Sequence, residues 1–189
     1  MHGTASRDCA RQVKAAAAGT AREQHRRSVD TFISHAESVA PEEWELPLAP
    51  GKWSPAQVAE HLRLTYEVVC RELEGGHGIR LRSPWWLRPI LRFRFLPMIL
   101  RGGRLPAGAR APREIRPGAG PFPRTALLQS LRDVAVRAEE AMAVRSPGAP
   151  GFTHHVFGRL QAGDALRFAA VHNEHHTRQI AGRSIPAGR

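Results

Sequence analysis

The stretch WSPAQVAEHL, residues 53–62, contains the clearest start of a helix in this chain of 189 residues. Ser54 is a favourable N-cap residue, and Pro55 suits the first helical position because the amide hydrogen that proline lacks has no helical partner there. Gln57, three residues after Ser54, completes a capping-box pattern. Apolar residues then recur at helical spacing until Gly75-Gly76. The sequence therefore predicts a helix that begins at Ser54 and ends before this glycine pair.

Three further segments show the apolar periodicity of amphipathic helices. They cover residues 20–40, which Pro41 ends, and approximately residues 124–144 and 164–180. A short helix is also expected around residues 87–100, although Pro89 and Pro97 limit its extent. No strand-type alternation of useful length is visible. Four helices of similar length with mostly long connections predict an all-α four-helix bundle.

A chain of this length is expected to form one domain with a core of its own. We expect a flexible N-terminal segment over residues 1–19, one four-helix domain over 20–184 with a long, basic, proline-rich insertion at 76–123, and a tail over 185–189. The sequence shows neither a membrane-spanning apolar run nor a signal peptide, and its two cysteines fit no metal or disulfide pattern. The expected compartment is the cytoplasm.

The net charge of +11 is concentrated in residues 80–124, the basic segment, which holds 11 arginines and a single acid, Glu114. No recognisable DNA-reading motif accompanies it, so nucleic acid is not an expected partner. Residues 84–104, PWWLRPILRFRFLPMILRGGR, combine tryptophans, aliphatic residues and arginines, as interfacial membrane segments do. The alternative is that these apolar side chains pack over the bundle and leave the arginines outside.

The stretch VHNEHHTRQI, residues 171–180, holds three of the chain's ten histidines. His172 and His176 share one helix face, and two imidazoles at this spacing can bind one metal ion. His175 can also reach toward His172, so spacing alone leaves the partner open. A third ligand must come from elsewhere, and His61 is the best candidate because it lies beside the buried face of its helix. The alternatives are a solvated histidine pair and a His61 that only satisfies a core carbonyl.

These segments together resemble the DinB-like superfamily of bacterial four-helix proteins, over about residues 20–182. The matching positions are Trp53, Ser54, His61, His154, Phe157, Gly158, His172, His176, Gln179 and Ile180. Position 155 departs from the family pattern, which usually has proline where this chain has histidine. The resemblance implies a metal-binding triad of His61, His172 and His176, with His175 as a neighbour rather than a ligand.

The superfamily includes YfiT-type proteins regarded as metal-dependent hydrolases, and transferases that use bacillithiol or mycothiol. The resemblance therefore implies one divalent transition metal (zinc, nickel or iron) and a small-molecule substrate, such as a low-molecular-weight thiol. Three imidazoles leave coordination positions open, as catalytic zinc sites do, so a metal-bound water or thiolate would be the reactive group. Gln179, His154 and His175 are candidates for supporting roles around the ligands.

Two other functions stay open at the level of the sequence. One is a non-catalytic, metal-bearing helical module in stress response. The other is binding of a membrane surface or an acidic partner through the basic segment. The oligomeric state is also open at this level, although a homodimer is common for bundles of this kind.

Overall fold

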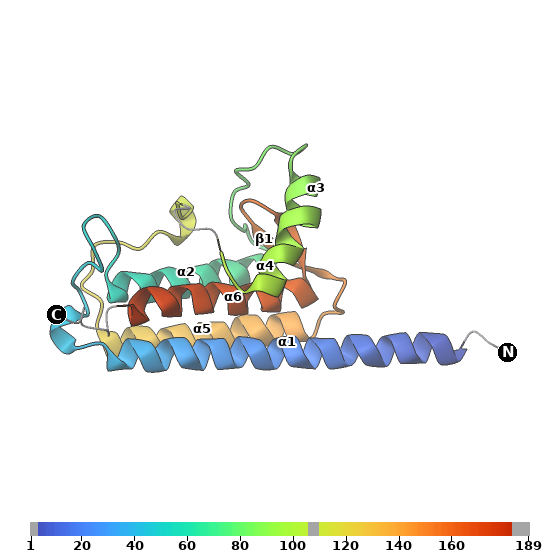
Figure 1. Ribbon diagram of the computed structural model, residues 1–189, viewed down its shortest axis with the longest axis horizontal. Helices are drawn as coiled ribbons and strands as arrows, with labels where there is room; N and C mark the ends of the chain where they lie inside the picture. Colours follow the sequence, from blue (N-terminus) through green and yellow to red (C-terminus); the bar gives the residue numbers. More distant parts are fainter. Residues whose placement is uncertain (1–3, 106–109, 183–189) are drawn as a thin grey trace.

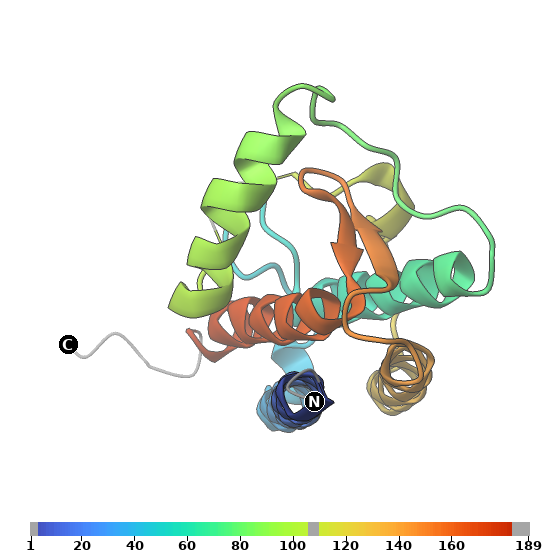
Figure 2. The ribbon, with the colours of Figure 1, turned by 90° about the vertical axis from the view of Figure 1, so that its right-hand side faces the viewer.

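The computed structural model describes residues 4–105 and 110–182, with side chains from residue 19 onward, and its main feature is a four-helix bundle (Figure 1). The long helices are α1 (Thr4–Ser38), α2 (Pro55–Leu73), α5 (Arg124–Ala143) and α6 (Ala162–Ala181). Viewed end-on, α2 and α6 form one layer and α1 and α5 the other (Figure 2). The predicted bundle is thereby confirmed.

The first helix differs from the sequence prediction at its start. We expected a flexible segment over residues 1–19 and a helix from residue 20, but α1 begins at Thr4. Residues 14–18, KAAAA, have high helix propensity, and no proline interrupts the chain before residue 41. The predicted tail at residues 185–189 lies outside the described residues.

The predicted capping box is present at the start of α2. The backbone N–H of Gln57 donates to Ser54 Oγ, and the backbone N–H of Ser54 donates to Gln57 Oε1, both at 3.1 Å. Val58 and Leu62 follow on the buried face, with 1% and 0% exposure. The cap therefore fixes where α2 begins and, with it, the place of His61 between these two core residues.

A β-hairpin precedes α6, which corrects the expectation of no strands. Strand β1 (Pro150–His154) pairs antiparallel with β2 (Gly158–Gln161), with Thr153 opposite Arg159. Strands this short leave little room for alternation to show in a sequence. Gly158, with a φ of 73°, occupies a conformation that favours glycine and begins the second strand.

The basic segment is partly helical. It contains α3 (Arg88–Ile90), a π-helical turn η2 (Leu91–Phe95), α4 (Leu96–Gly102) and a short 3₁₀ turn η3 (Arg113–Ile115), while another such turn, η1 (Pro41–Glu43), follows α1. The helix expected around residues 87–100 is therefore confirmed, although it continues through Pro97. This helical stretch and the hairpin lie over the outer side of the α2/α6 layer (Figures 1 and 2). No helix among the described residues is long and apolar enough to cross a membrane.

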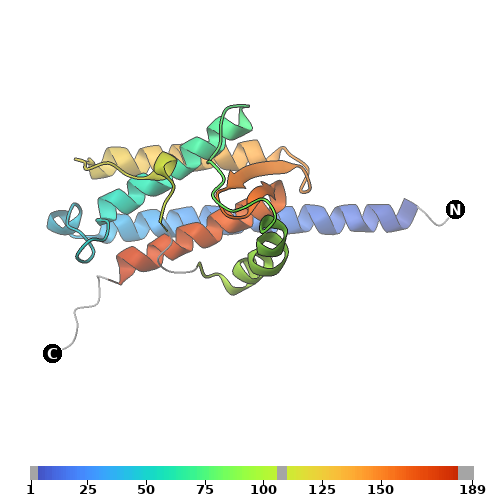
Figure 3. The ribbon, with the colours of Figure 1, turned by 90° about the horizontal axis from the view of Figure 1, so that it is seen from above.

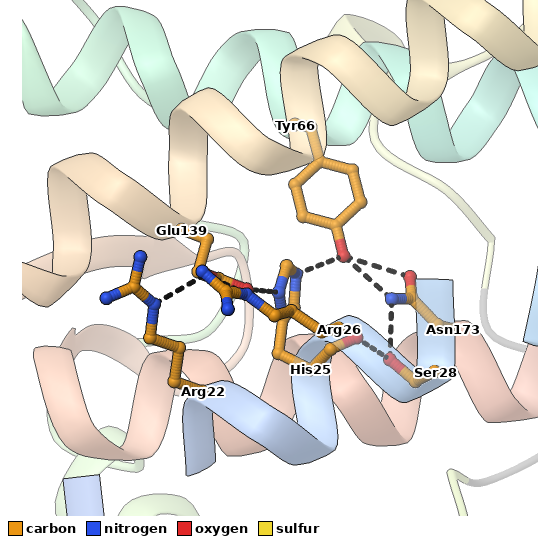
Figure 4. Close-up of polar contacts among 7 residues, drawn as sticks. All are labelled: Arg22, His25, Arg26, Ser28, Tyr66, Glu139 and Asn173. Atoms are coloured by element: carbon orange, nitrogen blue, oxygen red, sulfur yellow. Dashed lines mark hydrogen bonds and ion pairs between the residues drawn. The ribbon is translucent and has the colours of Figure 1, made fainter. Parts of the chain in front are cut away.

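A buried chain of hydrogen bonds joins all four long helices (Figure 4). Asn173 of α6 donates to the Tyr66 hydroxyl of α2 at 2.8 Å, and that hydroxyl lies 2.8 Å from Nε2 of His25 in α1. His25 Nδ1 is 3.0 Å from Oε2 of Glu139 in α5. We call these four residues the core polar chain.

Three further residues of α1 make hydrogen bonds to the core polar chain. Arg22 and Arg26 donate to Oε1 of Glu139, and Ser28 Oγ accepts from Asn173 Nδ2 at 2.9 Å. Burial raises the pKa of the Glu139 carboxyl, but the hydrogen bonds from His25 and Arg22 outweigh this effect and bring the pKa down to about 2. The carboxylate is therefore charged at every physiological pH.

We expect Glu139→Gln to lower the free energy of unfolding by roughly 2–3 kcal/mol at pH 7, because the variant loses a carboxylate whose pKa falls on folding. The difference from the wild type should shrink as the pH falls from about 4.5, the ordinary pKa, through about 2, below which Glu139 is protonated in both the folded and the unfolded state. Urea unfolding across this pH range measures it.

The matched control is Glu140→Gln, which removes an exposed carboxylate from the neighbouring position of α5. This variant should unfold at the same urea concentration as the wild type at each pH. Equal effects of the two substitutions would contradict a special role for Glu139.

Candidate metal centre

Three histidine side chains converge between α2 and α6. His172 Nε2 lies 3.0 Å from His176 Nε2 and 3.4 Å from His61 Nε2. His172 and His176 are neighbours on one face of α6, and His61 reaches them from α2. The structure therefore brings together the three histidines that the sequence proposed as ligands. No carboxylate or thiolate of the described residues belongs to this group.

The ring of His61 is held by two contacts. Its Nδ1 lies 2.7 Å from the carbonyl oxygen of Ile115, so Nδ1 carries the proton and donates it to that carbonyl. Trp53 lies against the ring, with centroids 4.9 Å apart. The Nε2 lone pair of His61 consequently faces α6.

Gln179 holds the ring of His176 in the same way. Its Oε1 lies 2.8 Å from His176 Nδ1, which therefore donates, and the Nε2 lone pair of His176 again faces the cluster. The amide nitrogen of Gln179 lies 3.0 Å from Nε2 of His175 and donates to it. His175 is thus bound to the residue that orients a ligand, and its own ring nitrogen is not part of the cluster.

The positions of the protons on the three imidazoles leave lone pairs available for a cation. With Nδ1 protonated on His61 and His176, both Nε2 atoms present lone pairs to His172, which can donate only one Nε2–H. One lone pair therefore faces another nitrogen at short range. A tetrahedral ion with metal–nitrogen bonds of about 2.0–2.1 Å separates its ligand nitrogens by about 3.3 Å, close to the distances from His172 to the other two, and all three nitrogens lie within 4.8 Å of one another. The three residues fit a divalent transition metal.

Burial lowers the pKa of all three imidazoles. The pKa of His61 falls to about 4, although its hydrogen bond to Ile115 acts in the opposite direction. The pKa values of His172 and His176 lie well below the ordinary range, first because of burial and then because of neighbouring imidazoles. All three rings are therefore neutral near pH 7, which is the form that binds a metal. His172 is the least buried of the three, with intermediate exposure, whereas His61 and His176 are buried.

His154, at the end of β1, lies next to the cluster rather than in it. Its ring stacks on Phe157 and contacts Phe168, with centroids 4.9 Å and 4.8 Å apart, and Phe168 in turn stacks on His172. The backbone N–H groups of Val156 and Phe157 both donate to His154 Nδ1. The neutral ring therefore carries its proton on Nε2.

Two parts of this site were missed by sequence reasoning. One is the carbonyl of Ile115, which belongs to the basic segment that we treated as a variable insertion. No side-chain pattern identifies a backbone acceptor 54 residues away from its donor. The other is the core polar chain beside the cluster. Its signal was a polar group next to an apolar stripe, as at Glu139, which directly follows the buried Ala138.

Comparison with known proteins agrees with this description. The family model of the DinB superfamily matches residues 24–180, and the chain belongs to that superfamily. Among solved structures, the four-helix bundle protein TT2238 is similar, with a TM-score of 0.51 and 23% sequence identity over 89% of this chain and 99% of that one. This likeness shows the fold. The search of curated proteins found no similar sequence.

In the chelated protein, we expect nitrogen NMR to find the proton of His61 on Nδ1 and to find the ring neutral until the pH approaches about 4. Because the unfolded ring titrates near 6.5, the chelated protein should also lose stability as the pH falls from 6.5 through 4. A proton on Nε2, or protonation near 6.5, would contradict the geometry described above.

Proposed function

We propose that this protein is a metal-dependent enzyme with an open three-histidine site, acting as a hydrolase or as an S-transferase for a low-molecular-weight thiol. The observation that carries the proposal is the convergence of three neutral Nε2 atoms, two of them oriented by hydrogen bonds at Nδ1. Structural zinc sites are closed by four protein ligands, whereas catalytic sites keep a position for water or substrate.

The neutral ligand set favours catalysis over simple metal storage. With no carboxylate or thiolate in the group, a bound divalent ion keeps its full charge. Such an ion supplies Lewis acidity and makes a water or thiol at its open position more acidic. Imidazole donors suit zinc, nickel and iron.

The surrounding residues hold the ligands and shape the approach to them. Ile115 and Gln179 fix the two ring orientations, and Trp53 covers one side of His61. The acids that adjoin the three histidines in the sequence serve other partners, because Glu60 is bound to Arg63 and Glu174 lies 3.8 Å from Arg178. His154, with its proton on Nε2, is the donor that we assign to orienting a substrate beside His172.

The first measurement is the metal content of protein purified without an affinity tag. We expect about one equivalent of a transition metal in the wild type, as for a single tetrahedral site. His61→Ala and His176→Ala should lose it, because two imidazoles remain. His175→Ala, the matched control on the same helix, should keep it. Gln179→Leu should keep the site but lower its affinity roughly 10- to 100-fold, since it removes the partner that orients His176.

Equal loss of metal in His175→Ala and His176→Ala would contradict this assignment of ligands. Absence of metal from the wild type after reconstitution with zinc, nickel and iron would contradict the proposal itself.

A second experiment separates the two reaction classes. Cobalt-loaded protein is mixed with cysteine as a probe thiol, and a thiolate-to-cobalt absorption band is expected if the open position accepts sulfur. A hydrolase should instead cleave an activated ester such as p-nitrophenyl acetate, and chelation should abolish the cleavage. His172→Ala serves as the control in both assays. Failure of both assays with metal-loaded protein would favour the non-catalytic module.

A further inference from the structure

The helical stretch of the basic segment presents large apolar side chains to solvent. Trp85, Trp86 and Phe93 are 77%, 61% and 78% exposed, and Ile90 and Met98 are about half exposed. Single exposed apolar residues are ordinary on a protein surface, but a group of large ones on one short stretch marks an interaction surface. We call residues 84–104 the tryptophan–arginine segment.

The inner side of this segment is already packed. Leu96 and Ile99 are buried in the main core, and Leu91 and Leu100 pack against it. The π turn η2 makes this possible, because its wider turn allows a five-residue step from Leu91 to Leu96 on the same side. The expectation that the apolar residues pack over the bundle therefore holds only for this side. The outward-facing apolar residues do not pack in the core.

The arginines around the exposed residues have no acidic partners. No ion pair joins an arginine of residues 80–124 to a carboxylate among the residues that the structure describes. Arg88 and Arg92 donate to the backbone carbonyls of Ser83 and Arg159, and these bonds leave their charges uncompensated. Exposed apolar groups and free positive charge thus occur on the same helical stretch.

The position of the segment leaves it free to meet a large flat surface. Seen from three sides, the helical stretch crosses the bundle obliquely, and its α3 end stands well away from the long helices (Figures 1–3). Trp85 and Trp86 immediately precede α3, so they lie at this outer end.

We propose that the tryptophan–arginine segment binds the surface of an anionic phospholipid bilayer. Tryptophan and phenylalanine enter the region between headgroups and acyl chains, and the arginines contact the lipid phosphates, as in amphipathic segments that lie in the interface. Arginine extends an apolar stem with a charge at its tip, so it can remain beside the buried aromatic rings. The segment lies on the membrane and does not span it.

The charge argues against a second copy of the chain as the occupant. A symmetric dimer places the same basic patch on both sides of the contact, so two surfaces of net positive charge would meet. An anionic bilayer supplies the missing negative charge and the apolar phase together. This proposal does not depend on the metal centre.

The test is sedimentation of the full chain with vesicles of phosphatidylcholine alone and of phosphatidylcholine containing phosphatidylserine. We expect binding to the anionic vesicles, at least roughly tenfold weaker binding to the neutral ones, and loss of binding when added salt screens the arginines. Tryptophan emission should shift to shorter wavelength on binding, because Trp85 and Trp86 leave water.

Two variants separate the apolar and charged contributions. Trp85→Ser/Trp86→Ser/Phe93→Ser should fold normally, since all three side chains are exposed, and should bind the anionic vesicles roughly tenfold or more weakly. Its control, Val136→Ser/Val144→Ser, removes exposed apolar residues elsewhere and should bind as the wild type does. Arg94→Gln/Arg101→Gln should weaken binding, whereas Arg27→Gln/Arg132→Gln, with arginines from α1 and α5, should weaken it less.

Three results would overturn the proposal. The first is no binding to anionic vesicles at low salt. The second is equal binding by the aromatic triple variant and the wild type. The third is self-association of the wild type in analytical ultracentrifugation that the triple variant abolishes, which would assign the surface to a second copy of the chain.

Discussion

The rest of the structure depends on the core polar chain, because its hydrogen bonds join all four long helices in directions that apolar packing alone does not fix. Each member is buried, so each must keep a partner or cost on the order of 1–3 kcal/mol. In one consistent set of proton positions, Asn173 donates to Tyr66, Tyr66 to His25, and His25 to Glu139. Rotation of any helix would break a link, so the chain specifies how the helices face one another as well as holding them together.

The consequence for the metal centre lies in the sequence neighbours His172 and Asn173. Successive residues of a helix point about 100° apart, so a helix that turns Asn173 toward Tyr66 and Ser28 turns His172 toward α2 and His61. One face of α6 therefore stabilises the bundle, and the adjacent face carries His172 and His176, which meet His61 of α2. Burial keeps all three imidazoles neutral. Without an ion, two of these imidazoles present lone pairs to the same neighbour, and packing alone gives no reason for that arrangement.

The parts of this structure that sequence reasoning predicted are those with short-range signals. The capping box at Ser54 spans three residues, and the pairing of His172 with His176 spans one helical turn. His61 was a candidate because it lies beside a buried helix face, and the family pattern identified it as the third ligand. Its neighbours in the sequence give no indication of a partner 111 residues away. At Glu139 the sequence shows only a polar residue beside an apolar stripe, which does not identify His25, 114 residues away, as its partner. The hairpin was missed because its strands are short. The start of α1 was missed because the alanine run was taken as part of a flexible N-terminal segment.

The basic segment illustrates how one stretch of chain can serve two ends. Its η3 turn supplies the Ile115 carbonyl that fixes the tautomer of His61, and Ile115 itself packs with Val68 of α2 and Ile79. The η3 end of the basic segment is therefore part of the site, and its sequence cannot vary as freely as that of an ordinary insertion. The helical end uses only its inner side for packing. The rest of the chain is nearly neutral, since residues 80–124 hold most of the net charge. Net charge favours solubility wherever it lies, but here it is concentrated on the part of the chain that also exposes Trp85, Trp86 and Phe93.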